Sequence, residues 1–340
     1  MKSIYGITLN ELENYFISRG DKKFKATQVF NWIYKKRVKS FDEMRNVSKK
    51  TIDDLKKEFI IDSLEVVEQL TDIDSKKFLF NLDDNRKIEA VLMYHDYGNS
   101  LCISTQVGCN MGCSFCESGR LKKVRNLTVD ELVKQYLTIE NLLGIKITHV
   151  VLMGIGEPFD NYDNVIKFID ILNTGVGIDL GSRHITVSTC GIVPKIREFI
   201  KDGRQVNLAI SLHAPNNTIR DSIMNINKAY KIEEVIEAVK EYISKTNRRV
   251  TFEYIMLKGV NDTVECAEEL SKLLKGMNCY VNLIPYNETT HIEYKKSSKD
   301  TIMRFYDVLK KNGISVTIRR EFGSKLKAAC GQLRSQYMEG

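Results

Sequence analysis

Three cysteines in the middle of the chain are spaced C-x-x-x-C-x-x-C. Cys109, Cys113 and Cys116 stand in a short loop that also contains a glycine. Thiolates on short loops hold iron–sulfur clusters, which usually take four of them, so three would leave one iron open to another ligand. Zinc would need a fourth Cys or His, and the two candidates, His149 and His184, stand in apolar, strand-like runs. The loop therefore favours an iron–sulfur cluster; a structural zinc site or three unconnected core thiols are the alternatives.

Further groups that could bind a ligand stand where apolar runs end. Gly156 and Glu157, in the run M-G-I-G-E-P, would let the backbone approach a ligand and offer a carboxylate to an ammonium group. Later runs end in hydroxyl, imidazole and amide groups, which can bind the ribose and carboxylate of a nucleoside-bearing ligand. Taken singly, each is explained equally well as ordinary loop capping. These later residues are Ser188, Ser211, Leu212, His213 and Asn287.

The elements that must position these groups alternate between strand and helix after residue 98. Strand-like runs are predicted at 101–104, 150–153, 185–188, 208–212, 250–256 and 281–284, each followed by a helical run. One helix begins with a capping box at Thr128 and Glu131 and ends at Gly144. About six such units predict an α/β fold, a partial (β/α)6 barrel with ligands at the carboxyl ends of its strands.

The first 60 residues differ in composition from the rest. They hold 14 Lys and Arg against 8 Asp and Glu, whereas the remaining 280 residues are almost neutral. Thr8 and Glu11 predict a capping box at the start of a small helical bundle. The excess of +6 indicates contact with a polyanion, most plausibly nucleic acid, and a merely solvated helical face is the alternative. Deleting this module should then weaken RNA binding and leave cluster assembly intact.

Four regions follow from these patterns. They are a basic helical domain at 1–60, a β connector at 61–97 with strands near 64–70, 77–82 and 87–94, the barrel at 98–322, and a C-terminal segment at 323–340. No apolar signal peptide follows Met1, and the longest uncharged apolar stretch, 147–156, is too short to span a bilayer. We therefore expect a cytoplasmic protein whose eight cysteines are reduced, with no membrane contact.

The cysteine loop, with an aromatic residue before its last Cys, resembles the cluster loop of radical S-adenosylmethionine (SAM) enzymes. Two further cysteines, Cys102 and the Cys330 of A-A-C-G-Q-L, extend the resemblance to the RlmN and Cfr family of RNA adenosine methyl synthases, over residues 5 to 335. The resemblance implies that Cys109, Cys113 and Cys116 hold a 4Fe-4S cluster whose open iron binds SAM. It also implies SAM contacts at Gly156 and Glu157 and at the five strand-end residues named above.

The same resemblance implies a mechanism that uses two SAM molecules per turnover. In this family one SAM methylates the cysteine that matches Cys330, and a radical made from the second SAM takes a hydrogen from that methyl group. The carbon radical adds to adenine, because an sp² C–H is too weak a nucleophile for direct methyl transfer, and a covalent protein–RNA adduct follows. The cysteine matching Cys102 resolves the adduct through a disulfide with Cys330. Glu89 matches a glutamate proposed to accept a proton or orient the adenine.

Within the family, RlmN-type members methylate C2 of adenosine in 23S rRNA and often in tRNA, whereas Cfr-type members methylate C8 and confer antibiotic resistance. Val107, Pro158 and Ala214 resemble the RlmN pattern, so we expect C2, with C8 as the alternative. A non-catalytic, zinc-stapled RNA-binding protein is the second alternative. The resemblance also implies an external electron donor such as flavodoxin, and we expect a monomer.

Three stretches depart from the family pattern. Glu117, Ser118 and Gly119 follow the cluster loop where a Thr-Gly pair is more usual; Cys190 replaces a residue without a thiol; and 323–327 lacks the acidic residues common before A-A-C-G-Q-L. The last departure concerns the segment that carries Cys330, so it bears on how that segment docks and on the choice of substrate. Cys190, Cys266 and Cys279 match no family role, and we expect them to be packing residues.

Overall fold

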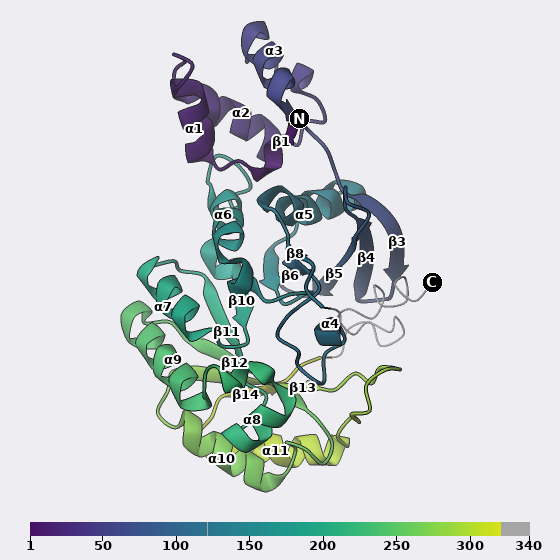
Figure 1. Cartoon of the computed structure of the whole chain (residues 1–340), viewed down its shortest axis with the longest axis vertical. Coiled ribbons are helices and arrows are strands. Elements are labelled where there is room, and N and C mark those ends of the chain that lie inside the picture. The colour runs from purple at the N-terminus through teal and green to yellow at the C-terminus, as the bar shows by residue number, and fades with distance from the viewer. Residues whose placement is uncertain (121, 321–340) are drawn as a thin grey trace.

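A ten-stranded sheet forms the centre of the molecule in a computed structural model that describes residues 1–120 and 122–320. Its strand order is β14-β13-β12-β11-β10-β9-β6-β5-β4-β3 (Figure 1). The seven strands from β14 to β6 are parallel to their neighbours, and β5, β4 and β3 continue the sheet in antiparallel order. The strands are β3 (Glu65–Thr71), β4 (Ser75–Asn81), β5 (Lys87–His95), β6 (Gly98–Ile103), β9 (His149–Leu152), β10 (Ile185–Thr189), β11 (Asn207–Ser211), β12 (Val250–Met256), β13 (Cys279–Pro285) and β14 (Val316–Ile318).

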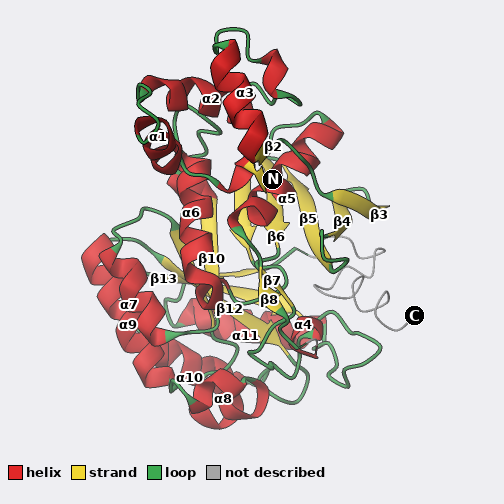
Figure 2. Cartoon of the chain, turned by 45° about the horizontal axis from the view of Figure 1, so that its top comes forward, coloured by secondary structure: helices red, strands yellow, loops and turns green. Residues whose placement is uncertain are grey.

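Helices connect the parallel strands and cover one side of the sheet (Figure 2). The six connecting helices are α5 (Val129–Leu143), α6 (Tyr162–Asn173), α7 (Val193–Lys201), α9 (Ile232–Thr246), α10 (Val264–Leu274) and α11 (Lys299–Lys311). The prediction of a partial barrel of six β-α units is thereby confirmed. Strand β14 was not predicted, because it has three residues of which Val316 alone is buried.

Local signals set the ends of α5 as predicted. The Thr128 backbone N–H donates to the Glu131 carboxylate at 2.9 Å, which satisfies one of the free amides at the helix start. Gly144 ends the helix with a φ of 62°, a left-handed conformation that glycine adopts without strain. Two shorter helices, α4 (Glu117–Arg120) and α8 (Asn217–Ile223), lie beside the carboxyl ends of the strands, and two small sheets pair β1 (Lys2–Ser3) with β2 (Phe59–Ile60) and β7 (Gln106–Val107) with β8 (Arg125–Asn126).

The N-terminal residues fold into α1 (Leu9–Ile17), α2 (Phe24–Tyr34) and α3 (Lys49–Glu58). Thr8 and Glu11 form the predicted capping box of α1. These helices share one hydrophobic core with α5 and α6, so the module is packed onto the barrel. Asn31 donates to the Val176 carbonyl at 3.1 Å, and a Cβ on Gly177 would lie 2.6 Å from the Phe30 ring.

The predicted β connector is an extension of the central sheet. In the register of β5 and β6, Val91 lies opposite Cys102, and in that of β4 and β5, Lys77 lies opposite Val91. Successive side chains alternate between the two faces of a sheet, so Lys77, Glu89, Val91 and Cys102 share one face. The three antiparallel strands thus place Glu89 beside the first barrel strand.

No helix of the part of the chain that the structure describes is both long and apolar enough to cross a membrane.

Candidate functional site

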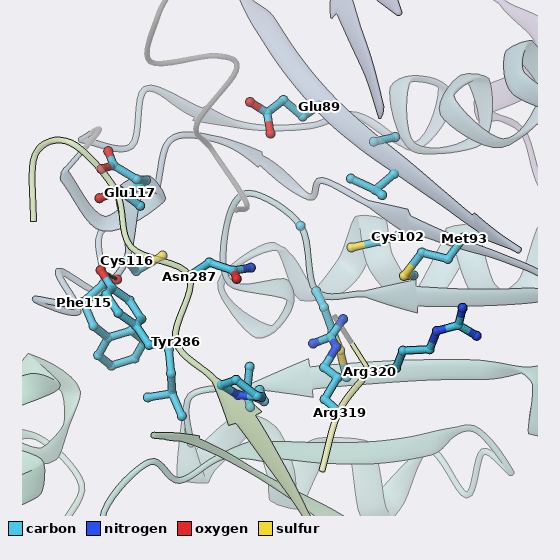
Figure 3. A pocket seen from close by; sticks show the side chains of 18 residues that line it. Glu89, Met93, Cys102, Phe115, Cys116, Glu117, Tyr286, Asn287, Arg319 and Arg320 are labelled. Atoms are coloured by element: carbon cyan, nitrogen blue, oxygen red, sulfur yellow. Dashed lines mark hydrogen bonds between the residues drawn. The ribbon is translucent and has the colours of Figure 1, made fainter. Parts of the chain in front are cut away.

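Two adjoining cavities at the carboxyl ends of the barrel strands contain most of the predicted site residues. One, here the cluster-loop cavity, is lined by Cys109, Cys113, Gly156, Glu157 and others. The other, here the Cys102 cavity, is lined by Cys102, Glu89 and Asn287 among others (Figure 3). Seven residues line both: Phe115, Cys116, Met153, Gly154, Ile255, Ile284 and Arg319. A ligand in one cavity would therefore lie against a ligand in the other.

The cluster loop is fixed by backbone hydrogen bonds. Ser114 donates to the Ile223 carbonyl at 3.0 Å, and Gly119 donates to the Cys116 carbonyl at 2.9 Å. Gly112 has a φ of 60°, a conformation that few other residues adopt. These contacts fix the path of the loop backbone.

The three thiols of the loop fit a cationic cluster. Burial raises the pKa of each thiol, to about 12 for Cys109, and the charges of the neighbouring thiolates add to this rise at Cys109 and Cys113. Thiolates here need compensating positive charge, which bound iron would supply, and binding would release the thiol protons. Among the described residues, no three His, Cys, Asp or Glu side chains gather closely enough to hold a single metal ion.

The two glycines of the run M-G-I-G-E-P lie too close to neighbouring backbone to carry a side chain, and two backbone N–H groups bind the carboxylate of its glutamate. A Cβ on Gly154 would lie 2.5 Å from the Ile103 carbonyl oxygen, and Gly156 has a φ of 108° against Gln106. The Glu157 carboxylate accepts the N–H of Phe159 at 3.0 Å and that of Cys190 at 2.8 Å. Burial raises the pKa of Glu157, and these hydrogen bonds oppose the rise. The remaining lone pairs can accept a donor in the cluster-loop cavity.

The strand-end residues divide between the two cavities. Ser188, Ser211 and His213 line the cluster-loop cavity, with the two serine hydroxyls 3.5 Å apart. Asn287 lines the Cys102 cavity instead. Leu212 lines neither cavity; its side chain is fully buried in the core.

His213 is held in one orientation. Its Nδ1 accepts the Ile255 N–H at 3.1 Å, and its ring meets Phe115 edge to face with centroids 5.0 Å apart. Burial lowers the pKa of His213 to about 3, with the Arg220 charge adding to the effect. The imidazole is therefore neutral at physiological pH, with Nε2–H left as a donor.

Cys102 and Glu89 lie on the sheet side of the Cys102 cavity, above Arg319 in Figure 3. Burial raises the pKa of the Cys102 thiol, and the positive charge of Arg319 acts against this. Glu89 forms a buried ion pair with Lys77, with Nζ and Oε2 3.0 Å apart. Cys330 lies outside the described residues.

Sequence reasoning missed three residues that shape the site. Arg220, wholly buried, donates to the carbonyls of Leu212 at 3.2 Å and Cys190 at 2.6 Å, and so fixes two strand-end loops. Glu253 lines the cluster-loop cavity, where burial raises its pKa. Arg319 lines both cavities. No local motif marks these residues, because each gains its position from contacts far along the chain.

The seven described cysteines are all free thiols. Cys266 and Cys279 are buried among apolar residues, as expected for packing residues. Cys190 is also buried, but it lines the cluster-loop cavity, and its backbone binds both Glu157 and Arg220.

Two family models match the chain. Residues 103–274 match the radical SAM superfamily, and residues 2–61 match the ribosomal RNA large subunit methyltransferase N-terminal domain.

Relatives match along almost the whole length. Proteins named "probable dual-specificity RNA methyltransferase RlmN" from Enterococcus faecalis and Acholeplasma laidlawii are each 53% identical. The alignment with the Enterococcus faecalis protein covers 99% of this chain and 97% of that protein. The alignment with the Acholeplasma laidlawii protein covers 98% of this chain and 99% of that protein. A crystal structure of a radical SAM methyltransferase from Sphaerobacter thermophilus superimposes with a TM-score of 0.91 at 39% identity, covering 98% of this chain and 99% of that one.

Proposed function

Because the chain belongs to the RlmN family of radical SAM RNA methyltransferases, we propose that it methylates C2 of an adenosine in RNA. The observation that carries the proposal is the shared wall of the two cavities. Cys116 of the cluster loop and Cys102 line the same cavity, so SAM chemistry and thiol chemistry would meet at one bound nucleotide.

The cluster-loop cavity would hold the cofactors. Cys109, Cys113 and Cys116 would ligate a 4Fe-4S cluster, which when bound supplies the electron that cleaves SAM to a carbon radical. Gly156 and Glu157 would bind the SAM amino group. Hydroxyls of Ser188 and Ser211, the His213 imidazole and the Leu212 backbone would bind the remaining polar groups of SAM, and Asn287 would bind SAM from the wall of the Cys102 cavity. Two SAM molecules would be used per turnover.

The Cys102 cavity would hold the target base. Cys330 would carry the methyl group and form the covalent adduct with the RNA. The Cys102 thiolate would then attack the Cys330 sulfur and displace the transferred carbon, which keeps the electron pair of the broken bond and takes up a proton to become the methyl group. The two cysteines would end as a disulfide that an external reductant must reduce. Burial raises the pKa of the Cys102 thiol, and the charge of Arg319 opposes that rise, in the direction of the thiolate that this attack requires. Glu89, anchored by Lys77, would orient the adenine or accept its proton.

The choice of C2 over C8 rests on Val107, Pro158 and Ala214, which resemble the RlmN pattern. The substrates would be 23S rRNA in the peptidyl-transferase region and a tRNA adenosine beside the anticodon, in keeping with the "dual-specificity" of the relatives' name. An electron donor of the flavodoxin class would reduce the cluster. We place the enzyme, as a monomer, in the reducing cytoplasm.

The decisive test is expression in a host that lacks its own enzyme, followed by mass spectrometry of nucleosides from 23S rRNA and tRNA. We expect 2-methyladenosine in both RNAs with the unaltered chain and none with Cys330→Ala. Finding 8-methyladenosine instead would establish the Cfr-type alternative. Metal analysis after anaerobic reconstitution addresses the other alternative, because zinc without iron would end the enzymatic proposal.

A further inference from the structure

Glu253 is a buried carboxylate on the inner face of the barrel, and the proposed function leaves its role open. Its side chain is 5% exposed and lines the cluster-loop cavity, as does Ile255 two residues later on β12. The alternate residues Phe252 and Tyr254 pack into the core. Successive side chains of a strand point to opposite faces, so the Glu253 carboxylate points into the barrel, where the cavity lies. Burial of a carboxylate is costly unless hydrogen-bond donors surround it.

Neighbouring strands hold the Glu253 carboxylate in one orientation. In the register of the sheet Glu253 lies beside Asn282 of β13, which lies beside Thr317 of β14. Asn282 Nδ2 donates to Glu253 Oε2 at 2.9 Å, and the Thr317 hydroxyl donates to Asn282 Oδ1 at 3.3 Å. The second bond fixes the Asn282 amide with its N–H toward Glu253. Among the described residues no donor binds Glu253 Oε1, so this oxygen is left for a ligand in the cavity.

On the other side of Glu253 stand two serine hydroxyls. Ser211 of β11 is its register partner, and Ser211 Oγ lies 3.5 Å from Ser188 Oγ on β10. Both serines line the cluster-loop cavity. Burial raises the pKa of Glu253, and the Arg319 charge and the Asn282 hydrogen bond oppose the rise. The cavity wall therefore places a carboxylate acceptor next to hydroxyls that can both donate and accept.

This set of groups suits the hydroxyls of a ribose. Each ribose hydroxyl both donates and accepts, so it needs an acceptor such as a carboxylate and a partner such as a serine hydroxyl. The amino group of an adenine ring donates, and the ring nitrogens accept, so the base does not need such a mixed set. Carboxylates bind ribose hydroxyls in this way in dinucleotide-binding folds. The SAM ammonium group has a proposed acceptor of its own in Glu157, which follows β9, beyond the strands that carry the serines.

We propose that Glu253 is a SAM-binding residue whose carboxylate accepts hydrogen bonds from the ribose hydroxyls. This inference deepens the proposed function and rests on it, since it presupposes SAM in the cluster-loop cavity. Asn282 occupies Oε2 and so leaves Oε1 to the ribose. Recognition of the ribose is then shared by three neighbouring strands, β10, β11 and β12.

The test changes the ligand and the enzyme together and measures binding instead of turnover. SAM, 2′-deoxy-SAM and 3′-deoxy-SAM are each titrated into iron-reconstituted protein in an anaerobic calorimeter, and Kd is measured. With the unaltered enzyme we expect at least one deoxy analogue to bind about 10- to 100-fold more weakly than SAM, the range for a hydrogen bond to a charged group. With Glu253→Ala the same two ligands should differ by less than about 5-fold, because only neutral partners remain.

Controls separate recognition of the ribose from damage to the site. Iron per chain is measured for every variant, and Glu268→Ala, which removes an exposed carboxylate of α10, should keep the full preference for SAM. A SAM analogue with hypoxanthine in place of adenine tests the amino group as the alternative donor. The affinity lost with this analogue should be the same with and without Glu253; a loss that disappears in Glu253→Ala would assign the residue to the base and overturn the inference.

Two further outcomes would overturn the inference. One is a Glu253→Ala protein with a full complement of iron that discriminates against the deoxy analogues as strongly as the unaltered enzyme does. The other is an unaltered enzyme that binds both deoxy analogues as tightly as SAM. Where Glu253→Ala takes up no iron, Glu253→Gln, which keeps the size of the side chain and loses its charge, should reduce the preference at least about 3-fold. Failure of the iron-loaded, unaltered chain to bind SAM at all would instead refute the proposed function.

Discussion

Lys77 is a fully buried cation, and the ion pair with Glu89 gives it a counter-charge in the apolar interior. Removing one member of a buried pair leaves an uncompensated charge and typically costs 3–5 kcal/mol. We expect Lys77→Met to lower the free energy of unfolding by about 3 kcal/mol in urea titrations. Lys76→Met, on the opposite face of the same strand, should lower the free energy of unfolding by less than about 1 kcal/mol. Equal losses of stability in the two variants would show that the Lys77–Glu89 ion pair does not account for the effect.

His213 makes stability depend on pH in a predictable direction. Its folded pKa of about 3 lies below the ordinary value of 6.5, so the unfolded chain binds a proton between these values while the folded chain does not. This contribution to stability is complete above pH 6.5 and decreases as the pH falls toward 3, by about 1.4 kcal/mol per pH unit.

The comparison variant is His213→Asn, because asparagine tolerates the φ of 57° at this position. Urea unfolding of cluster-free, reduced protein should give a steeper loss of stability below pH 6.5 for the unaltered chain than for the variant. Parallel pH profiles would show that His213 titrates normally.

Single residues could be predicted from sequence where the chemistry is local. The spacing of Cys109, Cys113 and Cys116 predicts a cluster loop without any structure, because all three candidate ligands stand in one short loop. Arg220 and Arg319 could not be predicted, since their partners are carbonyls and cavities formed by distant segments. Glu117 is a departure from the family pattern in the sequence, but its burial is a property of the fold.

Gly119, in α4 just after the cluster loop, lies too close to the loop backbone to carry a side chain. A Cβ on Gly119 would lie 2.8 Å from the Cys113 carbonyl oxygen and 3.1 Å from its nitrogen, and backbone atoms cannot move aside cheaply. We expect Gly119→Ala to displace Cys113 and lower the iron bound after anaerobic reconstitution several-fold. The control is Gly175→Ala, whose Cβ would lie no closer than 3.7 Å to its neighbours, and it should bind iron normally. Normal iron binding by Gly119→Ala would show that the loop can shift freely and would contradict the prediction.

Elements with strong local signals were predicted well. The capping box at Thr128 and the glycine at 144 place α5 within a residue of its observed ends. The connector strands were also predicted, but their membership of the central sheet was not, because strand pairing across β5 and β6 is a non-local property. Strand β14 is too short for its alternation to stand out.

The basic charge of the whole molecule is concentrated on a module that is packed into the common core. Deleting residues 1–60 would expose the apolar surfaces of α5 and α6, so charge reversal is the better test of RNA binding. Lys35, Lys36 and Lys39 are exposed and form no ion pair with a described carboxylate; Lys36 lies over the Trp32 ring.

Changing these three lysines together to glutamate should weaken RNA binding and make the slope of log Kd against log salt shallower by about 1 to 3, as each lost phosphate contact lowers it by somewhat less than one. The matched control reverses Lys240, Lys245 and Lys272, which are exposed on α9 and α10. Filter binding at several salt concentrations measures both. Equal effects of the two triple variants would mean that the charge acts through the overall field alone.

The common core of the N-terminal module and the barrel also bears on how an RNA is chosen. Two parts joined by packed side chains keep a constant separation, whereas parts joined by a linker would not. An RNA held by its phosphates at Lys35, Lys36 and Lys39, which follow the end of α2, can then present a base to the Cys102 cavity only if its own fold spans that separation. The enzyme would in this way select its targets by measuring length, and lengthening the RNA stem between the two points of contact should abolish methylation even where the sequence around the adenosine is unchanged.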